Sequence, residues 1–267
     1  MEISSDQIIA GFLLTLLAGL ATGIGSCLAF FSNRSDTRFL ACSLGFSGGV
    51  MIYISLVELL ASSHVTLGGI FGHRPGSLLA TAAFFGGIAV AMLIDKLVPS
   101  YENPHEVRKV EEMNAPLHHD KLVRSGTLFA LAIAIHNFPE GMATFTAALT
   151  NPVTGISIAL AIAIHNIPEG ITVSVPIYHA TGSRKRAFLL SFLSGLAEPL
   201  GALVAWLFLM PFLSPALLAC VFAAVAGIMV FISFDELLPL AEEYGEHHLA
   251  IYGLVGGMLV MALTLAW

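Results

Sequence analysis

The sequence predicts an all-α membrane protein with eight transmembrane helices, arranged as a 3+2+3 bundle of inverted repeats. Composition is the first observation: 57% of the 267 residues are apolar, and Asp, Glu, Lys and Arg together make up only 11%. A typical globular protein has roughly 45–50% apolar and about 25% charged residues. A helix needs about 20 apolar residues to cross a bilayer, so eight crossings occupy almost the whole chain. We therefore expect a single transmembrane domain over residues 1–267, with no room for a soluble catalytic domain.

Hydropathy is the second observation, because apolar segments follow one another along the chain with short connections between them. The segments lie near residues 8–31, 39–63, 78–98, 126–149, 153–179, 187–210, 215–241 and 249–267. The first follows Glu2 and Asp6 and is too long for the apolar core of a cleavable signal peptide, so we expect it to be retained. The connection at about 99–125 is polar and contains prolines, which predicts a loop.

The basic residues indicate the orientation, because Lys and Arg in short connections are held on the cytoplasmic side of a membrane. Ten of the eleven fall on one side of the predicted bundle, and only Arg74 lies opposite. The ten are Arg34, Arg38, Lys96, Arg108, Lys109, Lys121, Arg124, Arg184, Lys185 and Arg186. We expect both termini to be extracytoplasmic and the 99–125 loop to be cytoplasmic. Its histidines, His105, His118 and His119, could collect metal ions weakly or could simply be solvated.

Internal repeats are the third observation. Residues 129–141, FALAIAIHNFPEG, and residues 158–170, IALAIAIHNIPEG, agree at 11 of 13 positions. They fall on consecutive predicted helices joined by a short turn, so the two copies run antiparallel. An inverted repeat of this kind is typical of transporters.

A weaker repeat surrounds this central pair. Residues 49–60, GVMIYISLVELL, match residues 227–238, GIMVFISFDELL, and LAGLATGIG at 17–25 matches LSGLAEPLG at 193–201. The matched segments fall on helices that run in opposite directions. The repeats therefore predict three helices, a central pair, and three inverted helices.

Each central helix carries the motif His-Asn-x-Pro-Glu-Gly. At about 100° per residue, the His, the Asn and the Glu share one face of a helix, with the Glu between the other two. Such a Glu could bridge two metal ions. The Pro frees a helix carbonyl, which is tolerated at membrane depth only where protein or a water-filled cavity satisfies it. The candidate ligands are His136, Asn137, Glu140, His165, Asn166 and Glu169, with Glu198 of the sixth segment at a similar depth.

A single polar residue in a membrane helix often only holds helices together through hydrogen bonds. Seven are more than cohesion requires, because ionised or strongly polar groups are costly in a bilayer. Nitrogen and oxygen donors without thiolate favour zinc, iron, manganese, cobalt or cadmium as divalent ions. We expect such an ion as cargo, with no prosthetic group. Because metal ligands bind in their deprotonated form, we also expect uptake to slow as the pH falls.

Further acidic residues lie near the ends of predicted spans, where they could pass an ion in and out. Glu58 is near the outer end of the second span, and three others are near inner ends. These three are Asp95, Asp235 and Glu236. The alternative is that these carboxylates only extend from helix ends toward the aqueous interface.

HNFPEG, HNIPEG, SGLAEPLGA and FDELLPLA together resemble the ZIP family of metal-ion transporters, over essentially the whole chain. The resemblance implies a secondary transporter that imports zinc and other divalent metals, including iron, across the bacterial cytoplasmic (inner) membrane. It implies a paired, binuclear site. One metal would use His136, Glu140, His165 and Glu169, and the other would use Asn137, Asn166 and Glu198 with the two central Glu residues shared. The direction of transport rests on the resemblance.

Three alternatives stay open at this point. An exporter could use the same site, and an intramembrane metalloenzyme could hold a hydrolytic zinc, although the chain has no HExxH motif. A haem-binding electron carrier could use His136 and His165 as axial ligands. Helices rich in Gly and Ala could pack within one chain or between two, so a homodimer is also open. No nucleic-acid partner is expected.

Overall fold

The computed structural model describes residues 4–31, 37–97, 134, 137–212, 214–243 and 247–266. All regular structure in these residues is helical, and they include no strand. Seven of the helices are long and apolar enough to cross a membrane. The remaining predicted span, 126–149, is the fourth along the chain and is described only in part, with a helix over residues 137–150. The expected all-α membrane architecture is therefore confirmed, while the loop at 99–125 and its histidines lie outside the described residues.

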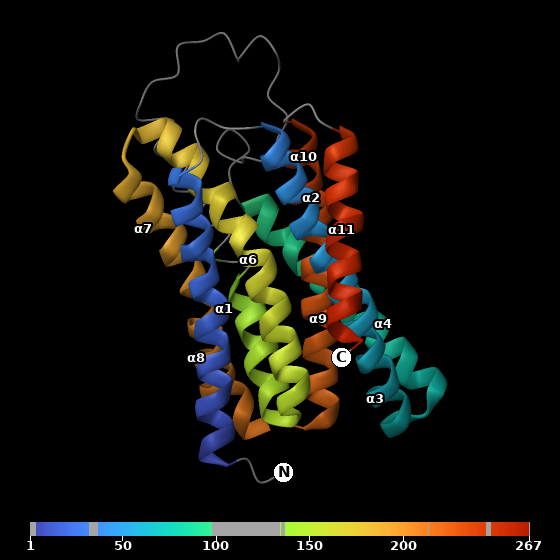
Figure 1. Cartoon of the computed structure of the whole chain (residues 1–267). Coiled ribbons are helices and arrows are strands. Elements are labelled where there is room, and N and C mark those ends of the chain that lie inside the picture. The colour runs from blue at the N-terminus through green and yellow to red at the C-terminus, as the bar shows by residue number, and fades with distance from the viewer. Residues whose placement is uncertain are drawn as a thin grey trace.

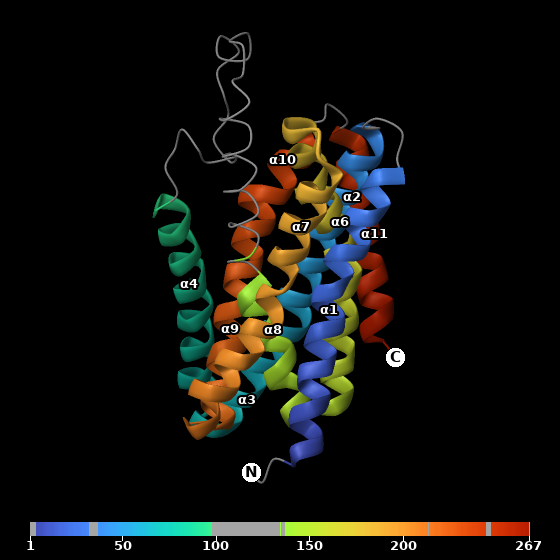
Figure 2. The same cartoon turned by 90° about the vertical axis from the view of Figure 1, so that its left-hand side faces the viewer.

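The described residues up to Leu97 form four helices and one π-helical stretch (Figures 1 and 2). They are α1 (Ser5–Phe31), α2 (Thr37–Tyr53), the π-helix η1 (Ile54–Leu60), α3 (Ala61–Phe71) and α4 (His73–Leu97). Helices α2, η1 and α3 follow one another without a break. The second predicted span, 39–63, thus ends too early: the helix continues to Phe71, and Gly72 alone, with φ 88°, connects it to α4.

The described residues from Asn137 onward begin with helix 137–150 and continue with the remaining elements. They are α6 (Pro152–Thr181), α7 (Arg184–Gly195), α8 (Ala197–Val204), the π-helix η2 (Ala205–Leu209), the 3₁₀ turn η3 (Met210–Phe212), α9 (Pro215–Ile232), the π-helix η4 (Ser233–Leu237), α10 (Leu238–Glu243) and α11 (His247–Leu265). Helices α6 and α9 begin at prolines behind the N-caps Asn151 and Ser214, whose side chains accept hydrogen bonds from the first free backbone N–H groups.

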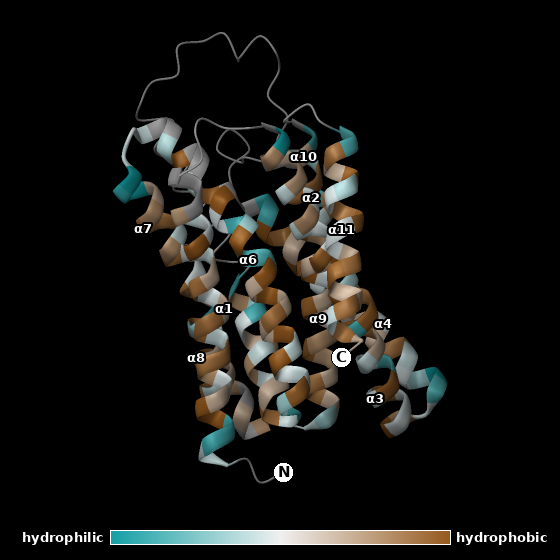
Figure 3. Cartoon of the chain, viewed as in Figure 1, coloured by the Kyte–Doolittle hydropathy of each residue, from teal (hydrophilic) through white to brown (hydrophobic). Residues whose placement is uncertain are grey.

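Apolar side chains cover the outside of the bundle. Leu17, Leu78 and Phe208 are 62%, 69% and 66% exposed, as side chains that face lipid would be. Hydrophobic residues prevail along the helices, whereas hydrophilic ones gather mainly near the helix ends (Figure 3). The polar residues away from the ends are mostly buried, which is the usual arrangement for polar groups at membrane depth.

The contact between α1 and α7 reveals the inverted repeat. Gly19 and Gly195 occupy matching positions in segments 17–25 and 193–201. A Cβ atom built on either glycine would lie 2.4 Å from the carbonyl oxygen of the other. Because two equivalent residues make the same contact with each other, the local axis of the repeat passes between them.

A second pair of contacts obeys the same relation. Gly25 of α1 packs against the carbonyl of Ile167 in α6, and its counterpart Gly201 of α8 packs against the carbonyl of Phe138. Phe138 and Ile167 are themselves matching positions of the HNxPEG repeat. The outer and inner repeats are therefore related by one inversion.

The outer repeat also has a shared backbone feature. Its two matched segments, 49–60 and 227–238, each contain a π-helical stretch: Ile54–Leu60 in one and Ser233–Leu237 in the other. Single-turn π-helices are rare and are often found at functional sites. These stretches carry Glu58 and Asp235, two of the residues expected along an ion path.

Candidate functional site

Six of the seven predicted ligands lie in the described part of the chain, and the bundle buries all six. Helix 137–150, α6 and α8 supply them. They are Asn137, Glu140, His165, Asn166, Glu169 and Glu198, each no more than 2% exposed. His136 lies outside the described residues. The histidine and the three glutamates among them can carry a charge, and the burial of such groups is costly unless they are paired or bind a cation.

His165 connects the two copies of the inner repeat. Its Nε2 atom lies 3.2 Å from Glu140 Oε2 on the neighbouring helix and 3.8 Å from Glu169 Oε2, one turn further along α6. Neither contact is aligned as a hydrogen bond. Both ring nitrogens, both Glu140 oxygens and Glu169 Oε1 have no hydrogen-bond partner among the described residues. Unpaired nitrogen and oxygen lone pairs therefore gather around His165.

The asparagine side chains are oriented by backbone carbonyls of the outer repeat. Asn166 Nδ2 donates to the Ala18 carbonyl oxygen at 2.9 Å and also to Glu198 Oε1. Asn137 Nδ2 donates to the Ser194 carbonyl oxygen at 3.3 Å. Each amide nitrogen is used in this way, whereas Oδ1 of both residues has no hydrogen-bond partner within the described residues. Each amide oxygen therefore remains available. Such oxygens suit a divalent cation.

This part of the site obeys the inverted repeat as well. Ala18 and Ser194 are matching positions, and so are Thr22 and Glu198. A Cβ atom on Gly141 would lie 2.0 Å from the Glu198 carbonyl oxygen, and one on Gly170 would lie 1.9 Å from that of Thr22. The backbone is thus repeated, whereas the side chains differ: one half of the site has a carboxylate and the other has a hydroxyl.

Thr22 is a residue that the sequence motifs did not single out. It is fully buried, and its hydroxyl has no hydrogen-bond partner among the described residues. The match between 17–25 and 193–201 places it opposite Glu198, so the signal was present in the repeat. The carbonyls of Ala18 and Ser194 could not be found from side-chain chemistry at all.

The predicted ligands are neighbours, but they do not form a closed coordination shell. Among the described residues, no group of three or more His, Cys, Asp and Glu side chains is arranged closely enough to hold a metal ion as it stands. Two of the predicted ligands are amides, which belong to a different class of donor, and His136 is not described. The ligand roles therefore remain predictions.

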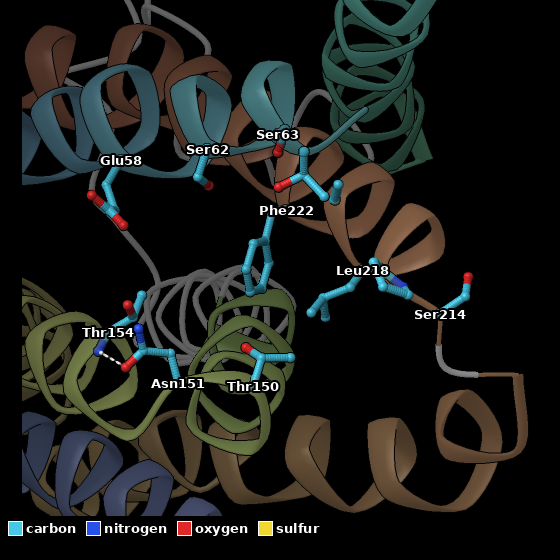
Figure 4. A pocket seen from close by; sticks show the side chains of 12 residues that line it. Glu58, Ser62, Ser63, Thr150, Asn151, Thr154, Ser214, Leu218 and Phe222 are labelled. Carbon is cyan, nitrogen blue, oxygen red and sulfur yellow. Dashed lines mark hydrogen bonds between the residues drawn. The ribbon is translucent and has the colours of Figure 1, made fainter. Parts of the chain in front are cut away.

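The predicted path residues lie toward opposite ends of the bundle. Glu58 is half-buried and lines a cavity of about 330 Å³ (Figure 4). Asp235 is half-buried at the other end, close enough to Asp95 for the two negative charges to repel each other. The side chain of Glu236 lies outside the described residues.

Two other histidines, His64 and His247, pair with side chains outside the candidate site. His64 Nδ1 lies 2.9 Å from Ser77 Oγ and so connects α3 to α4. His247 Nδ1 lies 3.0 Å from Glu242 Oε1 on the surface. Neither contact directs a ring toward the buried group around His165.

Comparison with known proteins places these features in a family. A family model described as ZIP zinc transporter matches residues 96–265. A zinc transporter ZupT of Akkermansia muciniphila is 60% identical over 269 residues, which cover 99% of this chain and 100% of that protein. The zinc transporters ZupT of Streptococcus mutans and Clostridium perfringens are 56% and 54% identical over 98% and 97% of this chain, and over 98% and 96% of their own lengths. The chain belongs to the ZIP family of zinc transporters, and the seven long apolar helices among its described residues make it a multi-pass membrane protein.

Proposed function

We propose that the protein is a secondary transporter that imports zinc and related divalent transition metals across the cytoplasmic membrane. Iron, manganese, cobalt and cadmium ions are the other expected cargoes, because nitrogen and oxygen donors without thiolate suit all of them. The observation that carries the proposal is the group of buried, unpaired lone pairs around His165 and Asn166. The names of the full-length relatives support zinc as a substrate.

The proposed binding centre has two metal positions. His136, Glu140, His165 and Glu169 would hold the first. The second would use Asn137, Asn166 and Glu198, with the two central glutamates shared. The short separations of His165 from Glu140 and Glu169, and the contact of Asn166 with Glu198, support this division.

The chemistry of the site accounts for reversible loading. An arriving ion exchanges water molecules for carboxylate, imidazole and amide donors, and any protons on the ligands must leave. The cation then compensates the negative charges that would otherwise be costly inside the bundle. When the ion departs, protons or water can replace it. This exchange makes occupancy sensitive to pH.

The proposed inward direction rests on the family resemblance, whereas the positive-inside rule supports only the orientation of the chain. We propose that the termini and Glu58 face the outside, and that Asp95 and Asp235 face the cytoplasm. A cation would then enter past Glu58, occupy the centre, and leave past the two aspartates. Glu236 would join this exit.

Uptake of radioactive Zn²⁺ into right-side-out membrane vesicles tests the proposal. We expect inward flux in the unsubstituted protein, a loss of at least about tenfold in Glu169→Ala, which removes a shared ligand, and competition by Fe²⁺ and Mn²⁺. Glu242→Gln is the matched control, because Glu242 is exposed and distant from the centre. Flux out of the vesicles, or undiminished uptake by Glu169→Ala, would overturn the proposal.

A further inference from the structure

The cavity beside Glu58 lies apart from the central ligands. Its walls come from η1 and α3, from the turn between helix 137–150 and α6, and from the start of α9 (Figure 4). These segments are distant in sequence. Glu58 lies on one wall, with Thr150 and Asn151 across the space from it.

Three of the six hydroxyl groups that line the cavity donate their protons to backbone carbonyl oxygens. Ser62 and Ser63 both donate to the carbonyl oxygen of Leu59, at 3.2 and 2.6 Å. Thr150 donates to the carbonyl oxygen of Ala147 at 2.9 Å. A hydroxyl has one proton and two lone pairs, so these three groups can only accept a hydrogen bond from whatever occupies the cavity.

The charge of the lining agrees with this polarity. Glu58 adds a carboxylate, which is acceptor-only when ionised. Asn151 uses its side-chain oxygen to cap α6, and its amide nitrogen is therefore the part left to donate. Ser214 Oγ accepts a hydrogen bond from the Leu217 N–H at 3.1 Å, so its proton is also left to donate. The three accepting hydroxyls and the carboxylate of Glu58 still outnumber these two donors, which favours a cationic hydrogen-bond donor over an anion.

The remaining wall determines how such a cation would be held. Leu218 and Phe222 also line the cavity, with the Phe222 ring between Ser63 and Thr150 (Figure 4), and they offer no metal ligand. An ion that lost its water on that side would gain nothing in return. The cavity volume of about 330 Å³ leaves room for a complete hydration shell, because six waters at about 30 Å³ each occupy about 180 Å³.

We propose that this cavity is an entry site for the hydrated divalent metal, held through its water molecules before it is dehydrated at the centre. The waters of the ion donate to Ser62, Ser63, Thr150 and Glu58, and the carboxylate also attracts the charge. This inference rests on the proposed import of divalent metals and adds a first, outer-sphere binding step to it. The entry site then concentrates cargo without selecting strongly among metals, because hydrated ions of equal charge resemble one another.

Hexaamminecobalt(III) provides a direct probe, because its ammonia ligands do not exchange and it presents only N–H donors. We expect it to inhibit zinc uptake by the unsubstituted protein competitively without being transported. We expect Glu58→Gln to require about fivefold more of the probe for half inhibition, equivalent to about 1 kcal/mol. The same variant should raise the KM for zinc and leave the maximal rate unchanged.

One control variant and one further test variant make the result specific. Asp6→Asn removes one exposed charge from the start of α1, outside the cavity, and should leave inhibition unchanged if a local site is responsible. Thr150→Val keeps the charge but removes one acceptor, and should weaken inhibition. Equal inhibition of the unsubstituted protein and Glu58→Gln would overturn the entry site, even with zinc uptake intact.

Equilibrium binding of the probe to the purified protein separates the two proposals. Binding of the probe that weakens in Glu58→Gln would support the entry site whether or not the protein carries zinc inward. Absence of probe binding would overturn the entry site, whereas absence of zinc flux would overturn the proposed import.

Discussion

His165 and Glu140 come from different copies of the same motif, and their Nε2 and Oε2 atoms lie 3.2 Å apart in the fully buried interior. Neither atom is satisfied by a hydrogen bond among the described residues. The inverted repeat therefore creates a shared group of lone pairs that neither helix could form alone. The first prediction follows from this contact.

Glu140→Gln should separate transport from stability. The substitution preserves shape but removes a carboxylate, so we expect zinc uptake to fall at least about tenfold through weaker metal binding. Zinc should raise the Tm of the unsubstituted protein, because a ligand that binds only the folded state stabilises it. Thermal unfolding of purified protein with and without zinc measures this. A full zinc-dependent rise in Tm for Glu140→Gln would argue against this ligand.

Zinc uptake should fall as the external pH is lowered from about 8 to about 5, the range in which histidine gains a proton. The sign follows because carboxylate and imidazole ligands bind metal only when deprotonated, so protons compete with zinc. Initial rates at fixed free zinc check the prediction, with vesicles at constant internal pH. A profile that is flat over this range would contradict it.

Thr22→Val should lower zinc uptake by about two- to fivefold while it preserves the fold. Val has nearly the shape of Thr but lacks the hydroxyl, whose burial without a partner costs about 1–3 kcal/mol. The Tm of the metal-free protein should therefore rise. Thr22→Ser, which restores the hydroxyl, should recover transport. Equal uptake by the Val and Ser variants would show that Thr22 serves only packing.

Gly25→Ala should destabilise the bundle by several kcal/mol, because a Cβ atom there would lie 1.9 Å from the Ile167 carbonyl oxygen. Gly86→Ala is the matched control: it changes a helical glycine with nothing within 4 Å of its Cβ position. The control should stabilise by about 0.5–1 kcal/mol through helix propensity. The midpoints of thermal unfolding of the two variants in detergent, each compared with that of the unsubstituted protein, measure these effects. Similar effects would be inconsistent with close packing at Gly25.

The orientation can be checked with single cysteines in a cysteine-free background. We expect Asp6→Cys to react with a membrane-impermeant maleimide from outside intact cells. Lys185→Cys, in the basic N-terminal turn of α7, should react only after the membrane is opened. The opposite labelling pattern would reverse the proposed topology and with it the assignment of entry and exit.

The sequence by itself determined the membrane class and the approximate spans, and it supplied the seven candidate ligands as a prediction. Hydropathy and the repeated HNxPEG motif are local, so they could be read without knowledge of packing. The end of the second span was predicted too early, because the helix continues beyond residue 63 to Phe71 and turns only at Gly72. Tertiary context can extend a helix past the point at which the local pattern weakens.

Only the tertiary structure decided which groups meet. Thr22 and the Ala18 carbonyl become part of the site because α1 packs on α6, with Gly170 allowing close approach. The entry cavity likewise joins Glu58 to Thr150, 92 positions later in the numbering. Such contacts depend on helix–helix distances and on which lone pairs remain unused after backbone hydrogen bonding. Those quantities arise from packing, and no local pattern in the chain encodes them.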